Sequence, residues 1–211
     1  MSPATLQPAI GGVAPPPPPI APPAAGEPPR RKWTRPEFLR LDELGFFDDH
    51  RVQLVFGEII EMGNMGWPHA RAMILVGARL RAVFAEGHWV AEEKPFAAAD
   101  SLPVPDFAVY EGSVLDQSDH PDRAALVIEV ADSTLQYDTT TKAELYATAG
   151  VTDYWVIDLN GRRLLIYRDP EPLPAGLGAT AYRTHSAHGP DATVSPLAAP
   201  HVAVTVADLL P

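Results

Sequence analysis

Two acidic residues interrupt segments that otherwise have the apolar composition of β-strands. Asp106 lies in residues 102–110, and Glu129 lies in residues 125–130. A buried carboxylate without a partner is unfavourable by several kcal/mol, and two carboxylates on neighbouring strands also repel each other. A divalent cation is the simplest group that makes such a pair favourable, and Mg²⁺ is usually held by one or two carboxylates with water and substrate phosphate. The pattern therefore indicates metal-assisted phosphodiester chemistry.

The size and composition of the chain favour a single globular domain. The sequence has 211 residues, of which 46% are hydrophobic, which is enough for one domain or at most two small ones. It has no cysteine, so disulfides, thiolate metal sites and cysteine nucleophiles are excluded. No apolar run approaches the roughly 20 residues of a membrane span, and no secretory signal pattern is found. We therefore expect a cytoplasmic protein without membrane association.

The net charge restricts how the chain can act on nucleic acid. The formal net charge is −11 at pH 7, whereas proteins that coat nucleic acid are usually basic because counterion release drives their binding. A non-specific coat protein is therefore excluded. An enzyme that contacts nucleic acid briefly, through a bound metal, remains compatible with this charge.

The first 30 residues are predicted to be a disordered, proline-rich tail. Five prolines are consecutive at residues 15–19, and four more follow before residue 30. Such a segment has few amide donors and little apolar mass, so we expect it to be extended and to act as a spacer rather than as a docking ligand. The folded domain is accordingly placed at residues 31–211.

Hydrophobic periodicity and turn residues predict an alternation of helices and strands. Thr34 and Glu37 form a capping box for a first short helix, and Asp138 is predicted to cap a later one. The strands are predicted at residues 52–56, 58–62, 89–93, 104–110, 125–130, 153–158 and 163–167, and the two longer helices at residues 69–86 and 138–149.

The C-terminal part and the order of elements complete the predicted fold. Residues 170–200 are rich in Pro, Gly and Ala and are predicted to be mainly loop, with a short strand at Tyr182; Val202, Val204 and Val206 alternate as a last strand. The order helix, three strands, helix, strand, with added hairpins, predicts an α/β fold of the α+β-like kind, in which helices pack on a mixed sheet. Active sites in such sheets gather beyond strand ends.

The order of these elements and the positions of the acids resemble the PD-(D/E)xK nuclease superfamily, and more narrowly the Uma-type restriction endonuclease family. The resemblance spans about residues 33–210 and implies a restriction-endonuclease-like core. The matching positions are residues 57–62, His69, Pro105, Asp106, residues 128–130, Ser133, Asp138, Lys142, Tyr146, Gly150, Val151 and residues 153–158.

The resemblance implies roles for three residues. Asp106 and Glu129 would ligate Mg²⁺ or Mn²⁺, which would lower the pKa of a bound water molecule and stabilise the transition state. A lysine would orient this water or neutralise developing charge. The superfamily pattern has that lysine two residues after the glutamate, where this chain has Ala131. Lys142, about one turn into the next helix, is the nearby replacement.

Each of these residues also has a structural interpretation. Lys142 lies four residues after Asp138, and ion pairs at this spacing on a helix surface contribute about 0.3–0.5 kcal/mol. Asp106 follows a proline and could be a turn or strand-entry residue. Glu129 is the hardest to explain in this way, because an acid inside an apolar strand needs a partner.

Two further residues are candidates for the site. Glu58 could add a carboxylate or hold a water molecule, although an acid on a hairpin is often solvated. His69, predicted at the start of a helix, could bind phosphate, act as an acid or make a local hydrogen bond. His185 and His188 have the spacing of a metal-binding pair but no acidic neighbours, so no metal site is predicted there.

These observations predict a metal-dependent endonuclease that hydrolyses DNA phosphodiester bonds with Asp106, Glu129 and Lys142. The alternative is a catalytically weak or inactive nuclease-fold protein that binds nucleic acid or a protein partner. The two acids favour the enzyme, whereas the acidic net charge and the displaced lysine favour the alternative. By analogy with nucleases that cut both strands, a homodimer is also expected.

Overall fold

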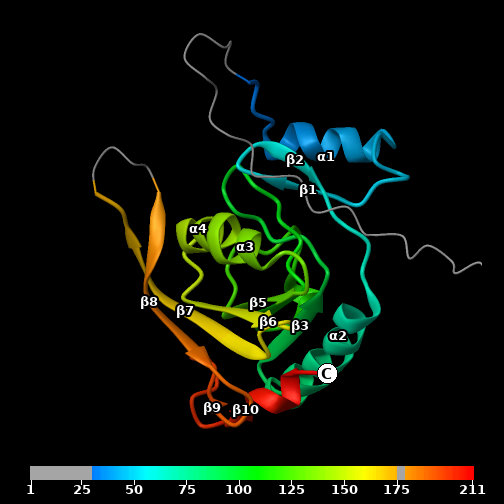
Figure 1. Ribbon diagram of the computed structural model, residues 1–211. Coiled ribbons are helices and arrows are strands. Elements are labelled where there is room, and N and C mark those ends of the chain that lie inside the picture. Colours follow the sequence, from blue (N-terminus) through cyan, green and yellow to red (C-terminus); the bar gives the residue numbers. More distant parts are fainter. Residues whose placement is uncertain (1–29, 175–178) are drawn as a thin grey trace, which may run out of the picture.

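A six-stranded mixed sheet forms the centre of the molecule, with the strand order β3-β4-β5-β6-β7-β8 (Figure 1). The structure is a computed structural model that describes residues 30–174 and 179–211. Neighbouring strands are antiparallel except for β5 and β6, which are parallel. The strands are β3 (His88–Glu92), β4 (Phe107–Glu111), β5 (Leu126–Ala131), β6 (Asp153–Asp158), β7 (Arg163–Pro172) and β8 (Thr180–His188).

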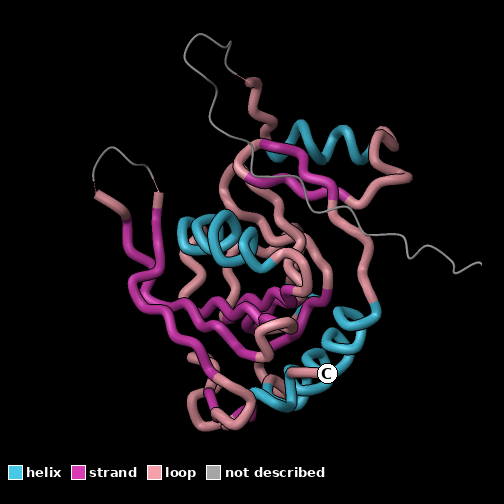
Figure 2. Tube along the Cα trace, in the orientation of Figure 1, coloured by secondary structure: helices cyan, strands magenta, loops and turns pink. Residues whose placement is uncertain are grey.

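The parallel pair β5–β6 requires a crossover, and a helical segment supplies it. This segment comprises α3 (Leu135–Tyr137), the π-helical turn η2 (Asp138–Lys142) and α4 (Ala143–Thr148). Every residue of β5 and β6 is buried, as expected for strands that are covered on both faces. Figure 2 shows these strands between the crossover helices and α2 (Trp67–Val83).

Two separate apolar cores fill the two faces of the sheet. Met73, Val76 and Leu80 of α2 pack on the face that carries Ile128 and Trp155. The opposite core contains Val127 and Tyr154 of the sheet and Leu145 and Tyr146 of α4. Because side chains alternate along a strand, Glu129 points to the same side as Val127, which is the side covered by α4.

A small layer made of α1 (Arg35–Glu43), β1 (Val52–Val55) and β2 (Glu58–Glu61) lies at one end of the sheet (Figure 1). The capping box of Thr34 and Glu37 that begins α1 is confirmed. The backbone amides of Leu54 on β1 and of Leu102 each donate a hydrogen bond to the other residue's carbonyl. The hairpin therefore lies beside the segment that leads into Asp106.

The C-terminal region differs from its prediction as loop. The hairpin β7–β8 has strands of ten and nine residues, and Pro170 is paired with Tyr182 inside it. The predicted short strand at Tyr182 lies in β8, where Tyr182 packs on the core. Five of the nine residues of β8 are exposed, so hydrophobic alternation did not reveal its full length. The predicted last strand is short, since β10 (Val204–Thr205) pairs only with β9 (Thr193–Val194).

Helix boundaries also differ from those predicted. Helix α2 begins at Trp67, two residues earlier than predicted, and ends at Val83. The early start is possible because Pro68 occupies a first-turn position, where its missing amide is harmless. The crossover helix begins at Leu135, so Asp138 lies within the helix and is not its cap. The remaining elements are the short 3₁₀ turns η1 (Val114–Asp116) and η3 (Val206–Leu209).

The predicted fold class is confirmed as a mixed α/β structure with a central mixed sheet. The predicted tail, residues 1–30, lies outside the described residues except for Arg30. Within the described part of the chain, the helices lack the combination of length and apolar character that a membrane crossing needs.

Candidate active site

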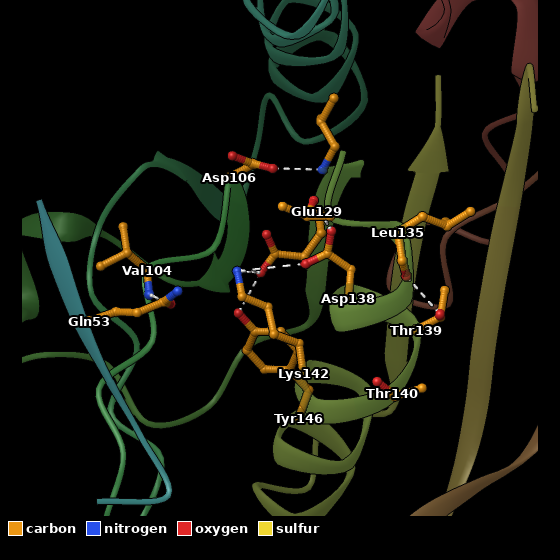
Figure 3. Close-up of polar contacts among 12 residues, drawn as sticks. Gln53, Val104, Asp106, Glu129, Leu135, Asp138, Thr139, Thr140, Lys142 and Tyr146 are labelled. Atoms are coloured by element: carbon orange, nitrogen blue, oxygen red, sulfur yellow. Dashed lines mark hydrogen bonds and ion pairs between the residues drawn. The ribbon is translucent and has the colours of Figure 1, made fainter. Parts of the chain in front are cut away.

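Asp106 lies at the entry of β4 and joins three elements. Its Oδ2 accepts a hydrogen bond from the backbone N of Val130 on β5 at 2.6 Å, a contact drawn in Figure 3. Its Oδ1 lies 3.2 Å from Nε2 of His69 on α2. The carboxylate is therefore fixed against the end of β5, and each of its oxygens has a single partner among the described residues.

Glu129 is buried on β5 and has one satisfied oxygen. Its side chain is 4% exposed, and its Oε1 accepts hydrogen bonds from Lys142 Nζ at 2.8 Å and from the Tyr146 hydroxyl at 2.7 Å (Figure 3). Its other oxygen, Oε2, has no hydrogen bond from any of the described residues. The carboxylate thus retains acceptor capacity that the protein does not use.

The crossover helix aligns three polar residues on one face toward Glu129. Asp138, Lys142 and Tyr146 follow one another at intervals of four residues and are all buried. In a regular α-helix each such interval overshoots a full turn by about 40°. The wider π-helical turn over Asp138–Lys142 counteracts this drift, so the three side chains remain aligned. Single π turns inside α-helices are often found at functional sites.

The local sequence explains where the helix widens. The hydroxyl of Thr139 donates to the carbonyl of Leu135 at 2.7 Å, and the hydroxyl of Thr140 donates to that of Gln136 at 2.6 Å. These side chains compete for carbonyls that an α-helix would bond through its own amides. Consecutive threonines therefore favour the π-helical turn at this position.

The interpretation of Asp138 and Lys142 as a surface ion pair is wrong. Both side chains are buried, and Lys142 Nζ lies 4.0 Å from Asp138 Oδ1 but 2.8 Å from Glu129 Oε1. Asp138 Oδ2 instead accepts a hydrogen bond from the Thr134 hydroxyl at 2.5 Å. The ammonium of Lys142 is thus directed into the cluster of acids.

The cluster contains three carboxylates and one ammonium, and this imbalance shifts their pKa values. Burial raises the pKa of Glu129 to about 8 against the opposing charge of Lys142, and the charges of Asp106 and Asp138 raise it further. Burial alone would lower the pKa of Lys142, but the three carboxylates outweigh it and hold the pKa above its usual value. Burial also raises the pKa of Asp138, again opposed by Lys142. The site therefore favours additional positive charge.

The residues of the site fit a hard divalent cation. Asp106 and Glu129 offer carboxylate oxygens with unused acceptor capacity, and one or two carboxylates suffice for Mg²⁺. Across residues 30–174 and 179–211, no group of three His, Asp or Glu side chains is arranged to hold a metal. The site thus resembles one in which water and substrate complete the coordination, rather than an all-protein cage.

His69 belongs to the site by position. Burial lowers its pKa, but the hydrogen bond and charge of Asp106 outweigh this effect, and the pKa lies above its usual value. The charges of Glu93 and Asp132 act in the same direction. This geometry is compatible with both of its predicted roles, a phosphate-binding or acidic group and a local hydrogen-bonding group.

Glu58 lies at the rim rather than in the cluster. Its Oε1 pairs with Lys32 Nζ at 2.5 Å, and none of the hydrogen bonds of the described residues connects it to Asp106, Glu129 or Lys142. Its charge acts on Tyr137, the residue before Asp138. The structure therefore connects four of the five predicted residues through hydrogen bonds and charge interactions, whereas Glu58 is paired with Lys32 and lies near Tyr137.

Asp138 and Tyr146 were not predicted as members of the cluster. The sequence does contain a signal for them, because Asp138, Lys142 and Tyr146 have the constant spacing of four that places residues on one helix face. That signal could be recognised only once Lys142 was known to face inward.

The comparisons with known proteins agree with this fold. A family model described as Uma2, putative restriction endonuclease, matches residues 35–207. A crystal structure of a putative nuclease belonging to DUF820 from Anabaena variabilis is similar with a TM-score of 0.66 and 20% identity, covering 83% of this chain and 96% of that one. No match was found among curated proteins. Because the family model covers most of the chain, the protein belongs to the Uma2 family of putative restriction endonucleases.

Proposed function

We propose that the protein is an endonuclease that hydrolyses DNA phosphodiester bonds with Mg²⁺ or Mn²⁺. The observation that carries this proposal is the arrangement in which the ammonium of Lys142 bonds the buried Glu129 while Asp106 is bonded to the next residue of the same strand, Val130. Membership of a family described as restriction endonucleases supports a nucleic-acid substrate, and DNA is the substrate that this description implies.

Asp106 and Glu129 are the residues that would hold the ion, Glu129 through its unused Oε2. When bound, the ion would supply Lewis-acid stabilisation of the phosphoryl group and lower the pKa of a water molecule. The backbone amide of Val130 orients the Asp106 carboxylate, and the Tyr146 hydroxyl orients that of Glu129. Both acids are thus fixed before any substrate binds.

Lys142 is proposed to act in two ways. Its ammonium, 2.8 Å from Glu129 Oε1, opposes the effect of burial and favours the ionised form of that carboxyl. The same positive charge can stabilise negative charge that develops on the phosphoryl oxygens in the transition state. It reaches the site from the crossover helix instead of from the glutamate's own strand.

The test is a cleavage assay with supercoiled, linear duplex and single-stranded DNA in Mg²⁺, in Mn²⁺ and in a chelator. We expect metal-dependent cleavage by the wild-type chain and none by Glu129→Ala. The control is Glu144→Gln, which removes an exposed acid from α4 and should cleave normally. Cleavage that persists in the chelator or in Glu129→Ala would overturn the proposed mechanism.

One observation favours the alternative, a nuclease-fold protein that binds nucleic acid or a protein without cleaving DNA. Lys142 and Tyr146 both occupy Glu129 Oε1, which leaves one oxygen of that carboxylate for a metal. Tight DNA binding without cleavage in either metal would support this second function.

A further inference from the structure

Trp67 is an exposed tryptophan beside the candidate active site. Its residue is 69% exposed, although tryptophan is highly buried on average. It begins α2 two residues before His69, whose Nε2 lies 3.2 Å from Asp106 Oδ1. A large aromatic surface is therefore presented to solvent at the start of the helix that carries His69, on a different side of the helix from His69 itself.

The backbone around Trp67 is held against the same end of β5 as the site. Gly66 caps α2, and a Cβ atom placed on it would lie 3.6 Å from Asp132 Oδ2. Asp132 directly follows β5, and its charge acts on His69. The start of α2 thus lies close to the end of β5, where Asp132 follows the strand.

Arg71 adds a positive charge one turn after Trp67 on the same helix face. It is exposed, and within the described residues it makes no salt bridge and no side-chain hydrogen bond. Arg79 and Arg81, further along α2, are instead paired with Asp208 and Glu92. In a chain of net charge −11, a cation without an acidic partner beside the site complements a phosphate.

We propose that Trp67 stacks on an unpaired base of the nucleic-acid substrate while Arg71 contacts the adjoining backbone phosphate. This inference rests on the proposed nuclease function and adds to it a preference for single-stranded or frayed substrates. Base–aromatic stacking tolerates any sequence, because every base has a π-face. An exposed tryptophan with a neighbouring arginine is the pair of groups that such a contact needs.

A second copy of the chain is the competing occupant of this surface. Ile74, 66% exposed, and Leu75 continue the exposed apolar side of α2 away from the site. A helix-to-helix dimer would use Ile74 as much as Trp67. Binding of a base at the start of α2 would use Trp67, which is two residues from His69, whereas Ile74 lies seven residues further along the helix. Ile74 therefore serves as a matched control.

The experiment uses the full-length wild-type chain, Mg²⁺ and single-stranded or duplex oligonucleotides with phosphorothioate linkages, which slow hydrolysis. The chain has four tryptophans, so the signal of Trp67 is the difference in fluorescence between wild type and Trp67→Phe. We expect quenching by the single strand and binding weakened about tenfold or more in Trp67→Ala. Trp67→Phe should recover part of the affinity, and Ile74→Ala should bind like wild type. Arg71→Gln should lower the number of counterions released on binding by about one, measured as the slope of log affinity against log salt concentration.

The outcomes separate this inference from the proposed function. Unchanged binding by Trp67→Ala, with cleavage still dependent on Glu129, overturns the stacking contact and leaves the nuclease intact. A loss shared equally by Trp67→Ala and Ile74→Ala, together with a smaller sedimenting species, assigns the surface to a second copy and also overturns it. Quenching through Trp67 without cleavage keeps the stacking contact and overturns the nuclease. A wild-type chain that binds no oligonucleotide overturns both.

Discussion

Buried acids at the two ends of β6 differ from those of the candidate site in how completely they are bonded. Asp153 is fully buried, and its oxygens accept hydrogen bonds from Arg168 Nε, Trp155 Nε1 and the backbone N of Leu197, each at 2.8 Å. These donors satisfy both oxygens, so no acceptor capacity is left for a ligand. Asp153 is therefore a structural acid.

Asp158 repeats this arrangement at the other end of the strand. It accepts from Arg163 Nε and from the backbone N of Gly161, each at 2.8 Å. Glu129 is equally buried, but both of its hydrogen bonds go to one oxygen, and two further carboxylates surround a single lysine. Burial of the acid is therefore common to both places, whereas incomplete bonding and an excess of negative charge distinguish the candidate site from the structural acids.

Asp106→Asn tests an acid of the candidate site and should have the largest effect, a loss of cleavage activity. The asparagine can still accept from the backbone N of Val130, so the fold should keep its stability, but a metal ligand is lost. We expect cleavage to fall by about a thousandfold, as for a group worth several kcal/mol in the transition state. Single-turnover cleavage and urea unfolding measure the two quantities. A variant that loses stability instead of activity would place Asp106 with the structural acids.

Asp153→Asn tests the structural side. It leaves the Arg168 guanidinium, which is largely buried at 27% exposure, without its carboxylate. We expect the free energy of unfolding to fall by about 3 kcal/mol, toward the lower end for breaking a buried ion pair. The folded fraction should cleave at the wild-type rate. Unchanged stability in urea denaturation would remove the distinction between the two kinds of acid.

Lys142→Met sharpens the comparison at the one cation of the cluster. The methionine can pack where the lysine stem lay, and Glu129, whose pKa burial raises and Lys142 lowers, would take up a proton more readily without the ammonium. Stability should therefore fall by less than the roughly 3–5 kcal/mol typical of a broken buried ion pair. Cleavage should fall by about a hundredfold, the loss expected for one stabilising group. Full cleavage by this variant would refute a catalytic role for Lys142.

His69→Gln should have the smallest effect, on the pH dependence of stability. Because Asp106 outweighs burial and raises the pKa of His69 above 6.5, protonated His69 stabilises the fold fully below that pH. This contribution is lost as the pH rises through the raised folded-state pKa. Thermal unfolding should therefore show a decline above pH 6.5 that is weaker in His69→Gln. Identical pH profiles would show that the contact with Asp106 contributes nothing to folding.

The sequence predicted the sheet, the two acids and the lysine because each left a local signal. Glu129 interrupts an apolar run, and such an interruption can be recognised without knowing its partners. The burial of Asp138 left no such signal, because its spacing from Lys142 is the same in a surface pair and in a buried cluster. Likewise, only the part of β8 around Tyr182 was predicted, since most residues of this strand are exposed and leave no hydrophobic periodicity.

The π-helical turn bears on the number of residues in the crossover helix as well as on their identity. Such a turn amounts to an α-helix with one residue inserted, here among consecutive threonines. Deleting a single threonine would remove that insertion and restore a continuous α-helix, whose flanking turns would keep their relative orientation. Asp138 would then precede Lys142 by three residues, a spacing that still places both side chains on one helix face. A related chain with a gap of one position among these threonines would therefore keep the same polar face.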